Sequence, residues 1–130
     1  GYFGNQQNNQ KNINGILNFK RKDTKKIREK MIKCFNMLSL SEKKLLRLYY
    51  GGMKKEKIIA RVNDRSDKWN DFKISNKKDL YKYKDNFTTK MDNIIKTEEP
   101  NFYYKFEMNK SKVQKVLSIL IMSDLINPEV

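Results

Sequence analysis

Few side chains in this sequence are suited to catalysis or to metal binding. Histidine is absent, and Cys34 is the only cysteine among 130 residues. Without histidine, the chain cannot form the Ser–His or Cys–His pairs that activate a nucleophile. A single cysteine also cannot supply the nitrogen and sulfur ligands of a structural zinc ion. We therefore expect no enzymatic activity, no cofactor and no metal site.

The carboxylates offer no clear cation site either. Asp64, Asp67 and Asp71 are spaced to share one face of a helix. A calcium site needs more oxygen ligands in a fixed loop geometry, and the sequence lacks the EF-hand pattern. Basic residues alternate with these aspartates, which indicates a neutralised face exposed to solvent.

Lysine dominates the chemistry that remains. The chain has 24 lysines and 5 arginines, and its formal net charge is +14. Such a surface attracts phosphates and holds them through the release of counterions, which predicts nucleic acid as the partner. A/T-rich codons would also produce many lysines, together with the 15 asparagines present. The alternative is therefore a helical protein–protein interaction module, of an exported or scaffold type, whose charge reflects the composition of an A/T-rich genome.

The residues expected to contact nucleic acid lie mainly on the first and last predicted helices. The last helix would reach phosphates or bases, and the first would add non-specific attraction. The predicted contacts are Lys110, Ser111, Lys112 and Lys115 on the last helix, Lys25, Lys26 and Lys30 on the first, and Lys105 among aromatic residues. Aromatic and basic residues also alternate in Tyr81-Lys-Tyr83-Lys, as in platforms that stack single-stranded bases, although Tyr83 falls on an apolar stripe.

The elements that must position these residues are predicted to form one mostly α domain. Residues 1–18 read as a flexible arm rich in Asn and Gln, and residues 19–130 as a domain of about five helices. No apolar run is long enough to span a membrane. The single cysteine favours a reducing, intracellular compartment, while the missing initial methionine leaves export open.

Apolar spacing and capping residues predict helices over 24–38, 39–50, 54–62, 77–96 and 109–124. The expected N-caps are Thr24, Ser39 in a capping box with Glu42, Asn76, and Asn109 or Ser111. Gly51-Gly52 ends the second helix. The period-two alternation of residues 101–108 favours one short strand before the last helix.

The expected core draws on the apolar side of each helix. Cys34 lies on or beside the stripe of the first helix, and we expect a small buried residue rather than a reactive thiol. Trp69 is interpreted as a core anchor. The longest helix carries a stripe predicted to be buried, made of Leu80, Tyr83, Phe87, Met91 and Ile94.

The segment from Asn109 to Ile126 resembles the recognition helix of winged-helix DNA-binding domains. The matching features are a basic start with a Ser/Lys pair, apolar residues at 113, 116/117 and 120, and a short turn into Leu-Ile. The resemblance implies that this helix contacts a DNA groove and leads into a wing strand. That family usually has glycine at or beside the position of Asp124.

Two further stretches resemble other families. Residues 40–60 are similar to the first two helices of sigma-factor-type helix-turn-helix domains, but the segment after Val62 is acidic where phosphate contact would be needed. The Leu-Ser-Glu-Lys-Lys-Leu and Lys-Lys-Asp-Leu-Tyr-Lys-Tyr stretches resemble the helical exported domains of malaria parasites, although a second tryptophan expected there is missing.

Overall fold

The structure, a computed structural model, describes residues 21–64 and 72–126. Within these ranges the fold is mostly α, as predicted. A 3₁₀ turn, η1 (Arg21–Asp23), is followed by α2 (Thr24–Phe35), α3 (Leu40–Tyr50), α4 (Lys55–Val62), α5 (Lys77–Glu98), α6 (Pro100–Lys105) and α7 (Lys110–Met122). The predicted arm at 1–18, Trp69, Asp67 and Asp71 lie outside the described residues.

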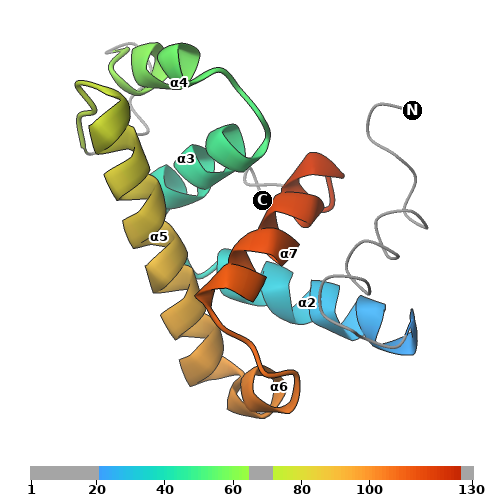
Figure 1. The fold of residues 1–130 in the computed structure, drawn as a ribbon. Coiled ribbons are helices and arrows are strands. Elements are labelled where there is room, and N and C mark those ends of the chain that lie inside the picture. The colour runs from blue at the N-terminus through green and yellow to red at the C-terminus, as the bar shows by residue number, and fades with distance from the viewer. Residues whose placement is uncertain (1–20, 65–71, 127–130) are drawn as a thin grey trace.

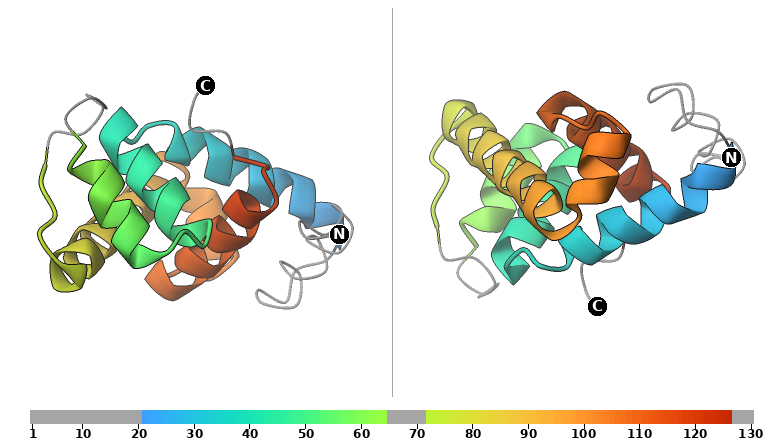
Figure 2. Two further views of the ribbon diagram at one scale, coloured as in Figure 1. Left: turned by 90° about the horizontal axis from the view of Figure 1, so that it is seen from above. Right: turned by 90° about the horizontal axis from the view of Figure 1, so that it is seen from below.

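The longest helix, α5, runs along one side of the molecule, and most of the other helices pack against it (Figure 1). It contacts α2, α3, α4, α6 and α7. The helix α4 lies against the first turns of α5, α3 reaches to the middle of α5, and α6 lies at its far end. Seen from above, α3 and α4 lie side by side (Figure 2, left), and they are in direct contact. The two ends of α5 therefore present different surroundings.

Two groups of buried side chains hold this arrangement together. The larger group draws on α2, α3, α5, α6 and α7 and includes Phe35, Leu46, Met91 and Leu117, all fully buried. The smaller group holds α3 and α4 against the start of α5 through Leu45, Ile58, Val62, Ile74 and Leu80. Burying apolar side chains at about 25 cal/mol per Å² supplies the main driving force for this packing.

The side chain of Asn63 stabilises the end that holds the smaller group. Its amide nitrogen donates to the Ile74 carbonyl at 2.6 Å, and its amide oxygen accepts from the Ile74 N–H at 3.3 Å. This pair of hydrogen bonds joins the residue after α4 to the segment that precedes α5. The first turns of α5 are thereby tied to α4.

Three of the predicted helix starts are confirmed by hydrogen bonds. Ser39 and Glu42 form the expected capping box, with the Glu42 N–H donating to Ser39 Oγ at 3.2 Å and the Ser39 N–H donating to Glu42 Oε1 at 2.8 Å. Asn76 and Asn109 accept from the N–H groups three residues ahead. The prediction for Thr24 is wrong: η1 runs directly into α2, so Thr24 occupies the first helical position instead of capping it.

Three helices end in the same reverse turn. In each, a residue with positive φ follows the cap, and two backbone hydrogen bonds close the turn in the Schellman pattern. The residues with positive φ are Gly52 after α3, Glu107 after α6 and Asp124 after α7. Gly52 confirms the predicted end of the second helix. Asp124 adopts the left-handed conformation for which glycine is the usual residue.

The predicted strand at 101–108 is wrong, because these residues form α6 and its closing turn. Pro100 sits at the first helical position, where its fixed φ favours a helix start. Phe102 and Tyr103 are buried, and the Tyr103 hydroxyl donates to Asp92 on α5 at 2.9 Å. Tyr104, which the alternating pattern placed with Phe102, is 62% exposed.

The buried stripe of α5 also differs from the prediction. Leu80 and Met91 are fully buried as expected, but the other fully buried positions are Thr88 and Ile95. Tyr83, Phe87 and Ile94 are half-buried and pack at the edges of the two groups. Because α5 is covered from several sides, its apolar side is broader than a single stripe.

Candidate nucleic-acid interface

Two lysines at the start of α7 are engaged within the protein. Lys110 Nζ lies 2.6 Å from Asp85 Oδ1 on α5, and the hydrogen bond from Lys110 helps hold the pKa of Asp85 below its usual value. Lys112 Nζ donates to the Glu107 carbonyl at 2.9 Å. Ser111 and Lys115 are exposed. The predicted basic start of this helix is thus partly neutralised by its own neighbours.

The lysines of α2 have intramolecular partners as well. Lys30 Nζ and Lys33 Nζ lie 3.1 and 2.8 Å from the same Glu99 oxygen, between α5 and α6. Hydrogen bonds from Lys33 and then Lys30 lower the pKa of Glu99. Lys25 is 4.0 Å from Glu29, in an exposed pair, and Lys26 is exposed.

The predicted contact residues do not converge on one site. Lys110 is attached to Asp85 and Lys30 to Glu99, and these carboxylates lie roughly 20 Å apart along the helix axis at about 1.5 Å per residue. Lys105 is bound differently, with its ammonium 5.3 Å from the centre of the Phe106 ring. The sequence therefore identified basic side chains without identifying a common surface.

A closer grouping of lysine and tyrosine lies where α3, α4 and α5 meet, on the turns of α5 that precede Asp85. Around the half-buried ring of Tyr49, Lys55 Nζ lies 4.7 Å and Lys84 Nζ 5.2 Å from the ring centre. Both distances are within the range of cation–π attraction. The Tyr81 ring meets Tyr49 edge-on at 6.2 Å. We call these four residues the Tyr49 cluster.

Buried contacts fix the position of Tyr49. The next residue, Tyr50, is buried, and its hydroxyl lies 2.8 Å from Thr88 Oγ1 on α5. Since the Thr88 hydroxyl donates to the Lys84 carbonyl at 2.8 Å, Tyr50 is the donor to Thr88. Burial raises the pKa of Tyr50 to about 12, so this hydroxyl stays protonated. The bond joins α3 to the turn of α5 that carries Lys84.

More lysines lie close in sequence to Lys55 and Lys84 of the Tyr49 cluster. Lys77 on α5 and Glu56 on α4 form an ion pair of 2.8 Å across the two helices. We call five exposed lysines, two at and near the start of α4 and three on the first two turns of α5, the basic rim: Lys54, Lys57, Lys77, Lys78 and Lys82. At i, i+4 and i+7, Lys77, Tyr81 and Lys84 share one side of α5.

The sequence contained part of the signal for this site. In the Tyr81-Lys-Tyr83-Lys run, Tyr81 is 44% exposed, whereas Tyr83 stacks on Phe72 with ring centres 4.7 Å apart. Tyr83 is therefore a packing residue, as its place on the apolar stripe indicated. Tyr49 was missed, because its relation to Lys84 depends on how α3 packs against α5.

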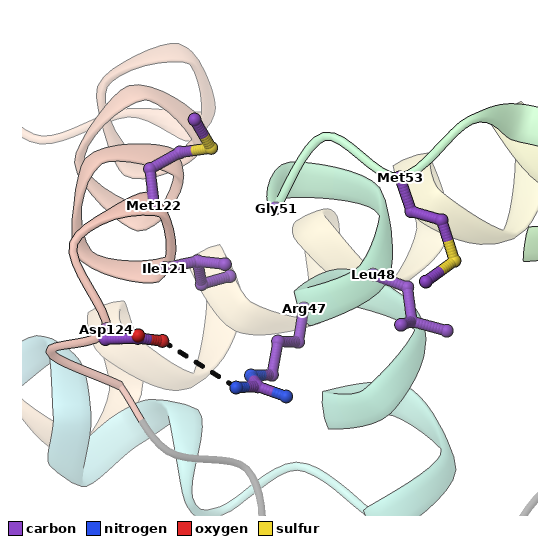
Figure 3. Close-up of a pocket in the computed structure, with 7 residues that line it drawn as sticks. All are labelled: Arg47, Leu48, Gly51, Met53, Ile121, Met122 and Asp124. Atoms are coloured by element: carbon purple, nitrogen blue, oxygen red, sulfur yellow. Dashed lines mark ion pairs between the residues drawn. The ribbon is translucent and has the colours of Figure 1, made fainter. Parts of the chain in front are cut away.

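A second surface feature lies between α3 and the end of α7. It is a pocket of about 310 Å³, with Arg47 and Asp124 joined across one side at 3.7 Å (Figure 3). The remaining lining is Leu48, Gly51, Met53, Ile121 and Met122. Flexible methionines beside one cation suit an apolar side chain better than a phosphate.

Other kinds of site find little support in the described ranges. Cys34 is fully buried, as predicted, and burial raises its pKa to about 11. No group of three or more cysteine, aspartate or glutamate side chains that could hold a metal ion occurs in residues 21–64 and 72–126. Across those same residues, no helix has the length and apolar character needed to cross a bilayer.

Comparison with known proteins does not assign a family. No protein-family model, no curated protein and no solved structure matches this chain.

Proposed function

We propose that this chain is a nucleic-acid-binding helical domain whose main contact surface is the Tyr49 cluster with its basic rim. The observation that carries the proposal is the convergence of lysines from α4 and α5 around the ring of Tyr49. A polyanion bound there would contact several ammonium groups at once and release the counterions they hold. The formal net charge of +14 would add long-range attraction for the same partner.

The lysines of α7 remain a second predicted contact. Lys110 must exchange Asp85 for a phosphate, but exposed ion pairs are worth only about 0–1 kcal/mol, so a phosphate can compete. Lys115 is exposed and needs no such exchange. Contact of this helix with a DNA groove, as the winged-helix resemblance implies, is thus a separate hypothesis with its own residues.

A salt titration tests the proposal directly. We expect binding to polynucleotides at low salt, with log Kd rising linearly with log salt concentration. The slope should be about 0.9 per phosphate contacted in duplex DNA and about 0.7 in a single strand. Failure to bind DNA or RNA of any kind at low salt would contradict the proposed function.

The pocket between α3 and α7 favours a second candidate, a protein-interaction module. Its apolar lining and the exposed Met122 would suit one side chain of a partner protein. Under this alternative, Met122→Asp would abolish partner binding and leave polynucleotide binding unchanged. The first proposal is favoured if the wild-type protein binds polynucleotides and Met122→Asp changes the binding of no protein partner.

A further inference from the structure

We infer that the Tyr49 cluster binds single-stranded nucleic acid in preference to duplex, with an unpaired base stacked on Tyr81. This inference rests on the proposed function and specifies the form of nucleic acid. The starting observation is the exposure of Tyr81, which is 44% accessible although its ring lies nearly perpendicular to that of Tyr49, with centres 6.2 Å apart. An aromatic surface of this kind within a lysine-rich region can accept the face of a base.

The ring beneath Tyr81 forms a firm support. Tyr49 packs edge-to-face against the buried Tyr50, with ring centres 5.4 Å apart. Tyr50 is in turn bonded to Thr88 on α5, the helix that carries Tyr81. A stacked base would therefore meet a surface that is already ordered, and binding would cost little side-chain entropy.

Cations lie on both sides of Tyr81 along α5. At about 1.5 Å per residue, Lys77 is roughly 6 Å before Tyr81 and Lys84 roughly 4.5 Å after it along the axis. A nucleotide stacked on Tyr81 has one phosphate on each side, and these two lysines could each reach one. The pair between Lys77 and Glu56 is exposed at both ends, so a phosphate can displace Glu56.

The preference for single strands follows because only an unpaired base exposes its face to the protein. In a duplex the faces of the bases are covered by their neighbours, and only edges and phosphates can be reached. Stacking on Tyr81 therefore requires an unpaired base, whereas the lysines could attract either form. The difference in binding free energy between single-stranded and duplex nucleic acid should therefore depend on the ring of Tyr81.

The test compares binding of a fluorescently labelled oligo(dT), an oligo(U) and a duplex hairpin with matched numbers of phosphates. For wild-type protein we expect tighter binding to the single strands, and the first two probes distinguish DNA from RNA. Tyr81→Ala should weaken single-strand binding by roughly ten-fold, as expected for loss of one stacked base. Its duplex affinity and its salt slope should be unchanged, because no phosphate contact is removed.

Two control variants keep the result interpretable. Tyr81→Phe retains the ring and should bind as the wild type does. Tyr104→Ala removes another exposed tyrosine, on α6, and should have no effect. Circular dichroism and a denaturation curve would establish that Tyr81→Ala is folded.

The outcomes separate this inference from the proposed function. Tighter binding to the duplex, or equal single-strand binding by Tyr81→Ala and wild type, would overturn the inference and leave nucleic-acid binding in place. Absence of binding to all three probes would overturn both.

Discussion

At the scale of single residues, burial decides which side chains can react. Cys34 illustrates this, because Lys30 and Lys33 precede it in the sequence, yet its thiol is fully buried in the larger core group. Desolvation outweighs the nearby positive charges and raises its pKa to about 11. Burial also raises the pKa of Tyr50, so its hydroxyl stays protonated and donates a hydrogen bond to Thr88.

Cys34 should resist thiol reagents in the folded protein. The thiolate is the reactive form, and both burial and the raised pKa suppress it near neutral pH. We expect slow labelling by a disulfide reagent such as dithiobis-nitrobenzoate, and rapid labelling once denaturant unfolds the chain. Rapid labelling of the native protein at neutral pH would show that the thiol is accessible.

Tyr50→Phe should destabilise the fold by about 1 kcal/mol, because it removes one buried hydrogen bond while Thr88 retains its bond to the Lys84 carbonyl. Chemical denaturation of the variant measures this difference. Tyr104→Phe is the matched control, since Tyr104 is exposed and its change should be close to neutral. Equal stability of Tyr50→Phe and wild type would mean that the bond between α3 and α5 contributes nothing.

At the scale of elements, the ends of the helices carry the clearest local signals. The reverse turns after α3, α6 and α7 share a geometry but differ in the residue with positive φ. Glycine takes this conformation at no steric cost, while a residue with a Cβ is disfavoured by roughly 1–2 kcal/mol. The closing turn of α6 therefore stores strain that the turn after α3 does not.

Glu107→Gly should stabilise the protein by up to about 1 kcal/mol, because φ is +50° at this position. Gly52→Ala should have the opposite effect of similar size. Apart from its two chain neighbours, no described residue comes within 4 Å of a Cβ added at Gly52, so only the backbone conformation is tested there. Thermal or urea denaturation of both variants checks the pair, and a destabilised Glu107→Gly would contradict the argument.

The capping box of α3 should make part of the stability depend on pH. Partial burial acts to raise the pKa of Glu42, but hydrogen bonds from the Ser39 N–H and Lys90 outweigh it and lower the pKa below 4.5. The contribution of Glu42 is therefore fully present above about pH 4.5 and is lost as the pH falls through the lowered folded-state pKa. The Glu42 carboxylate also links α3 to α5, because it lies 2.9 Å from Lys90 Nζ.

We expect Glu42→Gln to be less stable than wild type at pH 7, with a difference that shrinks below pH 4.5. Urea denaturation at a series of pH values measures it. Glu29→Gln is the control, because its pair with Lys25 is exposed and 4.0 Å long. A difference between Glu42→Gln and wild type that stays constant down to pH 2 would contradict the assignment.

At the scale of the whole molecule, the distribution of charge matters more than its total. Lys30 and Lys33 on α2 and Lys110 on α7 pair with the carboxylates of Glu99 and Asp85, whereas Lys55 and Lys84 lie over the ring of Tyr49. If binding occurs at one particular surface, removing the same number of charges from different surfaces should weaken nucleic-acid binding unequally. A diffuse electrostatic field predicts equal ones.

Three triple variants, each removing three positive charges, separate these cases. We expect Lys57, Lys78 and Lys82 to Gln to reduce the salt slope by about two, at 0.7–0.9 per phosphate contact. The triples Lys110, Lys112, Lys115 and Lys25, Lys26, Lys30 should reduce it less. Fluorescence anisotropy titrations at several salt concentrations provide the slopes. Equal losses from all three triples would show that the charge acts only as a general field.

Local sequence determined most of the helices and several of their caps. The capping box at Ser39 and the caps at Asn76 and Asn109 were predictable because they join residues only three apart. Tertiary structure decided the rest. Residues 101–105 form a helix and not a strand, because Phe102 and Tyr103, which are neighbours in sequence, are both buried against the core. Likewise, Glu99 binds Lys30 across 69 positions, and Tyr49 meets Lys84 only because α3 packs on α5. Spacing along one helix predicts its sides, but which charges are neutralised and which rings are exposed depends on contacts between helices.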